Sequence, residues 1–439
     1  MTTDSEPASR TAAAKDAERA ALPPSPPTEA RPDRRGFGAF LRDELTSATP
    51  FTVTLLAFVL ALVLGGVLVI LSDDTVRGAW SYFFARPGDA LSASWTAVSD
   101  AYAALFKGAI VDPESVSEAA SGAGPWTNVF YPISETLTNA APLIFTGLSV
   151  ALAFRAGLFN IGAEGQVVLG GIGAGLIGFG LHLPVVLHLI VALLGGLVGG
   201  ALWGVVPGLL KARTGAHEVI TTIMLNYVSF SLLVYLLGVK GFQDPNRSDA
   251  ISKRVGGSAE LPLIAGDPRL RVNLGIVLAI LAAAGVAWLL QRSTIGFELR
   301  AVGASPDAAR TAGMSVGAAY ALAMALAGGL SGLGGASLLL GPAHTLTPAF
   351  SAQFGFDGIT VALLGRARPW GVVLAGLLFG ALRAGAVRMQ GEAHIPVDMV
   401  SVLEALIVIF IAAPAFIKAF FRLRTERAAR LQTTLAKGW

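Results

Sequence analysis

The chain has 439 residues, of which 54% are hydrophobic and only 14% are charged. Soluble domains usually carry about 25% charged residues, so this composition excludes an ordinary soluble protein and indicates a membrane protein. The net charge of +3 implies no nucleic-acid partner, and the absence of cysteine excludes disulfides and thiol metal sites.

The amino-terminal part is predicted to contain a tail, a first span and a polar segment. Residues 1–45 are expected to form a disordered cytoplasmic tail, since their first part is rich in Ala, Pro, Ser and acids. The apolar run at 50–72 is long enough to cross a hydrocarbon core of about 30 Å. Residues 73–130 are polar with interspersed Trp and Phe, which favours an extracytoplasmic or interfacial segment. We therefore treat 46–135 as one region.

Repeated apolar runs dominate the rest of the chain. They predict spans at 136–154, 158–181, 184–210, 218–238, 273–290, 315–340, 369–390 and 397–420, with a short one at 354–366. Because backbone groups in lipid must be hydrogen-bonded within their own segment, we predict an all-α polytopic membrane protein with about ten transmembrane helices. The transmembrane domain would occupy 136–422 and be followed by a cytoplasmic tail at 423–439.

Basic residues indicate the orientation. Lys and Arg gather near span ends on one face, which predicts that both termini lie in the cytoplasm. The loop at 239–272 departs from this rule, because it carries six basic residues on the other face.

The stretch GLFNIGAEGQ places three polar side chains where an apolar span is expected. Asn160 and Glu164 are four residues apart and would share a helix face, with Gln166 beside them. An ionised Glu164 facing lipid would be costly, so it must face protein, water or a ligand. The glycines permit a broken helix, which is tolerated where it lines a cavity or is buried in protein. The stretch is thus either the wall of a translocation path or a structural cluster, in which Glu164 bonds a neighbouring helix or Arg155.

The stretch KARTGAHEVITTIMLNY contains a partial metalloprotease pattern. His217 and Glu218 match the start of HExxH, but Thr221 replaces the second His, which excludes that zinc site. Glu218 is expected to cap the next helix or to bind Arg213. Asn226 lies deeper in the span and could line a path or pack between helices.

One internal similarity suggests a repeat. EVITTIML at 218–225 resembles DGITVALL at 357–364. In the predicted topology the two copies run in opposite directions, as in an inverted-repeat transporter. Helix composition alone explains an eight-residue match equally well.

The segment at 293–315 predicts a short helix on the cytoplasmic face. Ser305 suits the N-cap, Pro306 the first helical position and Asp307 the first turn, while Gly313 is a natural stop. A helix of about two turns is not stable alone, so it should dock. It either lies on its own protein or enters a groove on a cytoplasmic partner.

Polar residues in the late spans carry further expectations. Arg383 and Arg388 are predicted to snorkel to the outer interface, and Glu404 to pair with one of them. Ser331 lies in GLSG, the setting of an intramembrane serine nucleophile. A glycine-rich helix contact explains this stretch better. The sequence has no Gly-Lys dipeptide and hence no Walker A loop, so ATP would have to bind a partner.

Three ordered segments resemble one family of transporters. LFNIGAEGQ (158–166), HEVITTIMLNY (217–227) and GFELRAVGASPDAARTAGMS (296–315) resemble signature segments of ABC transporter permeases. They are most similar to the bacterial nucleoside/simple-sugar uptake group, within the branched-chain amino acid/ribose permease superfamily. The resemblance covers roughly 135–420. It implies a type II ABC importer-like fold, with an inverted repeat as a candidate, in the bacterial cytoplasmic membrane.

The resemblance also implies a function and partners. The chain would be the permease subunit of an ATP-driven importer of nucleosides, with no catalytic residue, metal or cofactor of its own. It would form a heterodimer with a second permease of the same family. A cytoplasmic ABC ATPase would carry ATP and Mg, and an extracytoplasmic substrate-binding lipoprotein would deliver the nucleoside. A simple-sugar (ribose-like) ABC permease, an ion-coupled secondary transporter and an intramembrane serine protease are the alternatives.

Two groups of residues carry these roles. The expected substrate pathway comprises Asn160, Glu164, Gln166 and Asn226. The expected ATPase-coupling segment comprises Gly303, Ser305, Pro306, Asp307, Ala308, Ala309, Arg310 and Gly313.

Overall fold

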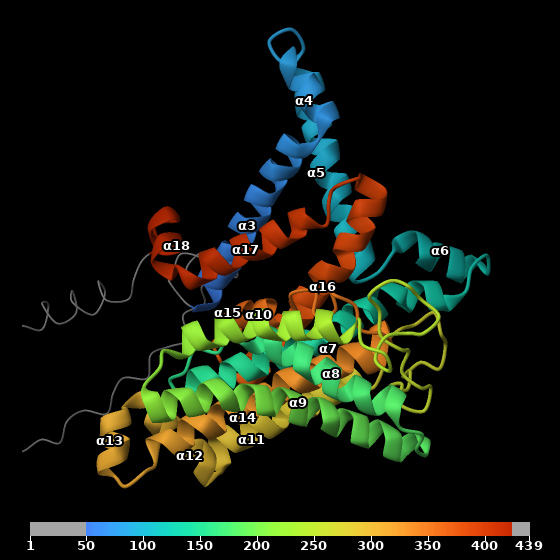
Figure 1. Ribbon diagram of the computed structural model, residues 1–439. Coiled ribbons are helices and arrows are strands. Elements are labelled where there is room, and N and C mark those ends of the chain that lie inside the picture. The colour runs from blue at the N-terminus through green and yellow to red at the C-terminus, as the bar shows by residue number, and fades with distance from the viewer. Residues whose placement is uncertain (1–49, 424–439) are drawn as a thin grey trace, which may run out of the picture. The chain divides into compact units, whose positions relative to one another are not determined.

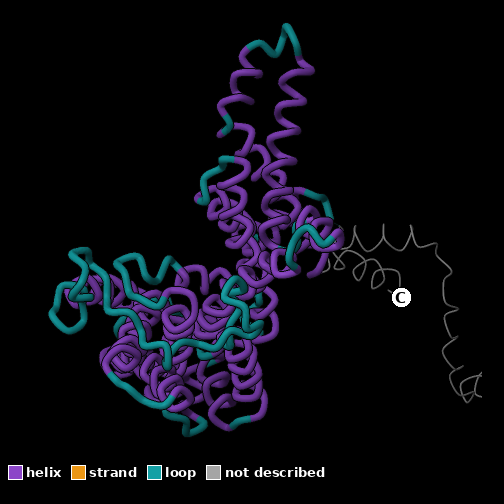
Figure 2. Tube along the Cα trace, turned by 90° about the vertical axis from the view of Figure 1, so that its right-hand side faces the viewer, coloured by secondary structure: helices purple, strands orange, loops and turns teal. Residues whose placement is uncertain are grey.

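The computed structural model describes residues 50–423. The expected tail at 1–45 lies outside the described residues, as does the expected tail at 423–439 apart from its first residue. Residues 53–421 form one compact unit. Every regular element among the described residues is a helix, and Figure 2 shows these helices joined by loops without a strand. The predicted all-α architecture is confirmed.

Within residues 50–423, eight helices are long and apolar enough to cross a membrane. They are α3 (Pro50–Ser72), α7 (Trp126–Arg155), α8 (Ala163–Gly180), α9 (Val185–Thr214), α10 (Glu218–Leu236), α11 (Gly275–Arg292), α14 (Val316–Leu338), which continues as the π-helix η1 (Leu339–Ala343), and α16 (Pro369–Ala393). The chain is therefore a multi-pass membrane protein.

Two of the ten expected spans are incomplete. The run at 354–366 forms α15 (Phe354–Leu364), whose 11 residues extend only about 17 Å, well short of a bilayer core. The run at 397–420 is broken into α17 (Asp398–Ala412) and α18 (Pro414–Phe420), which meet at 85°. Pro414 explains the break, because proline cannot continue the backbone ladder of the preceding helix.

The polar segment at 73–130 is helical. It forms α4 (Asp74–Ser81), α5 (Pro87–Ala109) and α6 (Pro113–Ser121), and Asp73 caps α4 by accepting bonds from the backbone N–H groups of Thr75 and Val76. The 23-residue α5 packs along α16. Exposed aromatic rings in this segment include Phe84, in the turn between α4 and α5, and Trp95 on α5. The segment therefore packs against the spans and is not an irregular loop.

Glycines bring α8, α9 and α14 into backbone contact. Figure 1 shows these helices side by side, and they pack against one another extensively. A Cβ atom at Gly332 would lie 2.2 Å from the carbonyl oxygen of Gly196, and one at Gly200 would lie 2.2 Å from that of Gly328. The predicted glycine-rich contact is confirmed.

Ser331 lies inside this contact. Its side chain is fully buried, and among the described residues its Oγ has no hydrogen-bond partner. A serine nucleophile needs an adjacent base to take its proton. The described residues therefore offer Ser331 no base, and the packing supports the glycine-rich contact instead.

The helices pack as two similar sets, α7–α10 and α14–α17. The contact of α9 with α14 corresponds to the contact of α16 with α7. In the same way, the contact of α8 with α14 corresponds to the contact of α15 with α7. α10 borders α8 as α17 borders α15. Both α8 and α15 begin with related sequences, GAEG at 162–165 and GFDG at 355–358. Four spans separate α7 from α14, so the two run in opposite directions if each span crosses once.

This packing supports an inverted repeat with a different register from the one expected. The match between 218–225 and 357–364 would pair α10 with α15, whereas the packing pairs α15 with α8. A short match in helix composition is a weak guide to equivalence, because the contacts that define a repeat are tertiary.

The loop at 239–272 is tied down by hydrogen bonds. Its backbone N–H groups at Ser252, Gly256 and Leu261 donate to carbonyl oxygens of Leu346, Gly178 and Leu340. Three of its four arginines form ion pairs: Arg247 with Asp249, Arg254 with Glu260 and Arg271 with Glu135. These three pairs offset half of the six basic residues in the loop.

Candidate functional site

The link between α7 and α8 is closed by a pair of amides. Asn160 Nδ2 donates to Gln166 Oε1 at 2.9 Å, and Gln166 Nε2 donates back to Asn160 Oδ1 at 3.2 Å. Asn160 also bonds the Ser149 hydroxyl and the backbone N–H of Gly162. Both amide side chains are essentially fully buried. The polar side chains of this stretch therefore satisfy one another.

Asn160 is not on a helix. α8 begins at Ala163, so Asn160 and Glu164 do not share a helix face as expected. Gly157 adopts a left-handed conformation with φ of 72° and turns the chain after α7. The break in the helix, which the glycines predicted, lies between Arg155 and Ala163.

Glu164 joins α8 to the start of α15. Its carboxylate accepts a hydrogen bond from the Ser351 hydroxyl and another, of 2.8 Å, from the backbone N–H of Gly355. A carboxylate at this position satisfies an unpaired N–H at a helix start and complements the helix dipole. Glu164 thus bonds a neighbouring helix, while Arg155 donates to the carbonyl oxygen of Ala367.

Asn226 fastens α10 to the start of α8. Its Oδ1 accepts from the backbone N–H of Gly165 at 2.9 Å, and its Nδ2 donates to the carbonyl oxygen of Ile161 at 3.0 Å. All four expected pathway residues therefore make structural contacts here. Their role in a pathway stays a prediction.

A cavity of about 570 Å³ lies among α7, α15, α16 and α17. None of the four expected pathway residues lines it. Its polar lining comprises Asn139, Gln353, Asp357, Thr360, Arg383, Ser401 and Glu404. Its apolar lining includes Phe379 and Val400. Apolar walls with a few convergent polar groups are typical of small-molecule sites.

An ion pair holds one side of the cavity. The Arg383 guanidinium pairs with the Asp357 carboxylate and donates to the carbonyl oxygen of Ala352 at 2.9 Å. Arg383 Cζ also lies 4.0 Å from the ring centroid of Phe354, within range of a cation–π contact. Each side chain of the pair is about one-fifth exposed. Arg383 is therefore held inside the protein and does not snorkel.

Glu404 faces the same cavity without a partner. The residue is 7% exposed, and its Oε1 has no hydrogen bond within residues 50–423. The expected pairing of Glu404 with Arg383 or Arg388 is wrong, because both arginines bind other carboxylates. Arg388 contacts Asp112 and Glu392, each at 2.6 Å.

The contact with Arg388 lowers the pKa of Asp112. Burial raises the pKa of its carboxyl, but hydrogen bonds from Arg388 and the backbone N–H of Glu114, together with the Arg388 charge, outweigh burial. The pKa of Asp112 therefore lies below its ordinary value. The pair ties the turn between α5 and α6 to α16.

The expected coupling segment forms the helix α13 (Pro306–Thr311), which follows α12 (Thr294–Ala304). The Ser305 hydroxyl accepts from the backbone N–H of Ala308, and Pro306 is the first helical residue, as predicted. After the helix, Gly313 has φ of 85°. Its N–H bonds the carbonyl oxygen of Arg310, and that of Met314 bonds Ala309, which together form a Schellman motif. With six residues, α13 is slightly shorter than expected.

α13 has a docked side and an exposed side. Ala309 is 3% exposed and faces its own protein. Asp307 and Arg310 form an ion pair of 3.2 Å with exposed side chains. The helix therefore rests on the chain and presents charges outward.

The coupling segment touches the link between α7 and α8. A Cβ atom at Gly303 would lie 2.4 Å from the carbonyl oxygen of Arg155 and 2.8 Å from the backbone nitrogen of Gly157. The two backbones are thus in direct contact. Two segments that sequence analysis singled out separately meet at this point.

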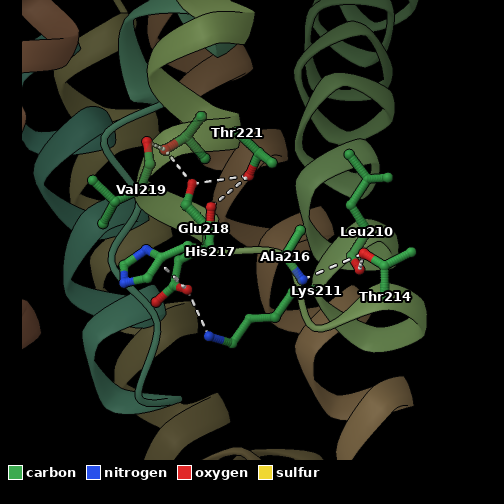
Figure 3. A network of polar contacts seen from close by, with 9 residues as sticks. Leu210, Lys211, Thr214, Ala216, His217, Glu218, Val219 and Thr221 are labelled. Atoms are coloured by element: carbon green, nitrogen blue, oxygen red, sulfur yellow. Dashed lines mark hydrogen bonds and ion pairs between the residues drawn. The ribbon is translucent and has the colours of Figure 1, made fainter.

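The turn between α9 and α10 carries another ion pair. Figure 3 shows the Lys211 amine directed at the Glu218 carboxylate, and the two lie 2.5 Å apart. Glu218 was expected to cap α10 or to bind Arg213. It binds Lys211 instead, and α10 has no side-chain cap. Lys211 lies in the last turn of α9, and both side chains of this pair are largely buried.

Sequence reasoning did not assign Asp357, Gln353 or Asn139 to a site. Asp357 was noted only as part of the repeat. A carboxylate inside a short apolar helix is itself a signal of function, because charge is costly in a membrane. Gln353 and Asn139 carry no such signal, since their place in the cavity depends on tertiary packing.

A cavity lined by polar groups in a multi-pass helical protein fits a membrane transport component. A family model described as branched-chain amino acid transport system / permease component matches residues 133–412. The chain belongs to this family. It is therefore a transport subunit and not an enzyme.

The chain is similar to several characterised permeases. It is 39% identical to the guanosine ABC transporter permease protein NupP of Bacillus subtilis, over 70% of this chain and 90% of the relative. It is 37% identical to the nucleoside ABC transporter permease protein NupB of Lactococcus lactis, over 65% and 80%. It is 34% identical to the glucose ABC transporter permease protein TsgB13 of Haloferax volcanii, over 66% and 78%. No solved structure matches the chain.

Proposed function

We propose that this chain is the permease subunit of an ATP-driven ABC importer that carries nucleosides across the bacterial cytoplasmic membrane. The observation that carries the proposal is the similarity to nucleoside permeases, at 39% and 37% identity over most of each relative. The three segments that resemble permease signatures all lie within the matched region at 133–412.

The cavity supports a neutral, polar substrate. Its volume of about 570 Å³ lies within the range of small-molecule sites. Asn139, Gln353, Thr360 and Ser401 offer amides and hydroxyls for ribose and base, and Phe379 offers an apolar surface. Asp357 and Arg383 neutralise each other. We propose this cavity as part of the substrate path.

The four expected pathway residues then act as the support behind the cavity. Glu164 holds the start of α15, the helix that carries Asp357 and Thr360 into the cavity. Asn160, Gln166 and Asn226 hold the start of α8, from which Glu164 extends. Loss of Glu164 would free α15 to shift, and the cavity would change shape with it.

The proposed partners are a second permease of the same family, a cytoplasmic ABC ATPase and an extracytoplasmic substrate-binding lipoprotein. ATP and Mg would reside on the ATPase. The exposed charges of α13, Asp307 and Arg310, are the proposed contact with it. This arrangement requires α13, and with it both termini, to lie in the cytoplasm.

A connected set of contacts supports coupling between α13 and the cavity. α13 follows α12, whose end touches the link between α7 and α8 through Gly303. That link leads into α8 and Glu164, which holds α15. An ATPase that binds α13 differently in two states would bias the position of α15 between them.

A simple sugar is the second candidate substrate. The 34% identity to a glucose permease favours it, and the polar groups of the cavity suit sugar hydroxyls equally well. The aromatic and apolar side of the cavity, with Phe379 and Val400, favours a base.

Uptake by cells tests the proposal. We expect labelled guanosine to enter cells that carry the complete transport system, to stop entering when ATP is depleted, and to be displaced by unlabelled nucleosides. Uptake of labelled glucose or ribose, without uptake of labelled guanosine, would select the sugar alternative. Concentrative uptake by the purified chain alone in liposomes, driven by an ion gradient, would contradict the proposal and revive the secondary transporter.

A further inference from the structure

The ion pair of the cavity leaves polar atoms of both its members unused. Arg383 Nη2 donates to Asp357 Oδ2 and to the carbonyl oxygen of Ala352, whereas Asp357 Oδ1 accepts no hydrogen bond from the described residues. Nε and Nη1 of Arg383 likewise donate to none of them. Both side chains line the cavity, and each is about one-fifth exposed. Asp357 Oδ1 is not enclosed by protein atoms, unlike Oε1 of Glu404. The pair therefore offers a ligand one acceptor and several donors.

The pair is held in a fixed position. The Arg383 guanidinium lies over the Phe354 ring, with 4.0 Å between Cζ and the ring centroid, and its bond to the Ala352 carbonyl oxygen anchors it further. Glu164 fixes the start of α15, the helix that carries Asp357, by accepting from a backbone N–H at 2.8 Å. Polar groups that are already ordered bind a ligand without the cost of ordering them.

The unused atoms match two neighbouring hydroxyl groups. A hydroxyl both donates and accepts, so one hydroxyl can donate to the Asp357 carboxylate while its neighbour accepts from the Arg383 guanidinium. Such bonds to charged partners are stronger than bonds between neutral groups. A nucleoside carries two neighbouring hydroxyls at the 2′ and 3′ positions of its ribose, and a simple sugar carries them around its ring. The two candidate substrates share this feature, whereas only the nucleoside has a base.

We propose that Asp357 and Arg383 are specificity-determining residues that bind the neighbouring hydroxyls of the substrate's sugar ring, and so favour ribonucleosides over deoxynucleosides. The proposal rests on the proposed function, because it assumes that nucleosides enter this cavity. A site built to bind a hydroxyl rejects the analogue that lacks it, since the polar groups of the site are then left unpaired.

Protection of a thiol in the cavity tests this proposal. The chain has no cysteine, and Ala405→Cys adds one to the cavity lining without removing a polar group. The transporter is purified from its native host through a tag on this chain, so that its bound partners stay with it. The rate at which a charged thiol reagent modifies the cysteine is measured against increasing guanosine, 2′-deoxyguanosine and 3′-deoxyguanosine.

We expect guanosine to halve the modification rate at a concentration about tenfold lower than either deoxynucleoside. Each deoxynucleoside lacks one hydroxyl of the pair, and a hydrogen bond to a charged group is worth about a factor of ten or more in affinity. This comparison needs no change to Asp357 or Arg383, so it does not depend on whether a variant folds.

Two variants in the Ala405→Cys background assign the preference to the ion pair. Asp357→Ala should reduce the preference for guanosine. The double variant Asp357→Ala with Arg383→Met should abolish it, and this variant leaves no unpaired charge in the protein. Asp249→Ala, which breaks an exposed pair in the loop at 239–272, should keep the preference. A variant that only loosened α15 would weaken protection by all three nucleosides and leave their ratio unchanged.

The possible failures are distinguishable. Equal protection by the three nucleosides in the Ala405→Cys chain would overturn the role of the ion pair and leave the proposed function standing. An undiminished preference for guanosine in the double variant would do the same. Modification that no nucleoside slows would overturn the assignment of this cavity to the nucleoside path itself.

Discussion

The helices α9 and α14 and the helices α15 to α17 are packed in opposite ways. Between α9 and α14 the backbones touch, so that a Cβ at Gly332 would lie 2.2 Å from a carbonyl oxygen. Among α15, α16 and α17 there is a cavity of about 570 Å³ with charged side chains. Close backbone packing allows few arrangements, whereas a hollow lined by polar groups can accommodate a ligand. We infer that α9 and α14 form the rigid region of the protein and that α15, α16 and α17 form the substrate-binding region.

The largest effect on the amount of folded protein is expected from a larger side chain in the contact between α9 and α14. Gly332→Ala places a methyl group against the backbone of α9, and overpacking of this kind costs about 1–3 kcal/mol or more. We expect a large fall in the amount of folded protein in the membrane, measured by size-exclusion chromatography of a fluorescent fusion.

Gly329→Ala is the matched control on the same helix. Its Cβ would meet its nearest neighbour, the side chain of Leu197, at 3.5 Å, which is an ordinary contact. We expect near-normal amounts of protein. Equal behaviour of the two variants would contradict the view that α9 and α14 are locked through Gly332.

The next largest effect, on uptake, is expected from the substrate-binding region formed by α15, α16 and α17. Asp357→Ala leaves Arg383 without its carboxylate, and breaking a fully buried pair costs about 3–5 kcal/mol. The cost here is smaller because each side chain is about one-fifth exposed. We expect labelled guanosine uptake to fall by about tenfold or more, with protein still detectable in the membrane.

The exposed pair of Arg247 and Asp249 provides the comparison, since both side chains are 54% exposed. Asp249→Ala should change uptake by less than about twofold, because surface pairs contribute little. Normal uptake by Asp357→Ala would show that the ion pair of Asp357 and Arg383 is not needed for transport.

A smaller effect on folding, but a specific one on transport, is expected from α13. Asp307→Arg changes an exposed side chain, so we expect normal insertion. Uptake should be lost while ATP hydrolysis by the assembled complex becomes independent of substrate. Asp74→Arg is closely matched, because Asp74 is also exposed and also pairs with an arginine three residues on. A coupled, active Asp307→Arg transporter would rule out the docking role of α13.

The smallest effect is expected from Ser331→Ala. The Ser331 hydroxyl is buried without a hydrogen-bond partner among the described residues, so its removal should leave uptake within about twofold of the wild type. Abolished uptake with a normal amount of protein would indicate a chemical role for Ser331 that the packing does not explain.

Much of the fold could be predicted from hydropathy and helix caps. The first span at 50–72 and the caps of α13 at Ser305 and Gly313 agree with the structure. Pro414 marks the end of α17 in the sequence itself. Local sequence could not predict that α5 packs along α16, because tertiary contacts decide it.

The site was less predictable than the fold. The polar stretch from Asn160 to Gln166 attracted attention because it is unusual in a membrane span, yet its side chains satisfy one another. Glu404 was expected to pair with an arginine, but both candidates are taken by carboxylates from other parts of the chain. Sequence shows which residues are costly to bury and does not show which of them find partners.

Accessibility of the cavity during transport is the most direct test of the account. The chain has no cysteine, so Ser401→Cys introduces a single thiol into the cavity lining, and Ser81→Cys introduces one outside it. We predict that a charged thiol reagent blocks guanosine uptake in Ser401→Cys, that guanosine slows this reaction, and that labelled Ser81→Cys transports normally. Full uptake after complete modification of Ser401→Cys would contradict the assignment of this cavity to the substrate path.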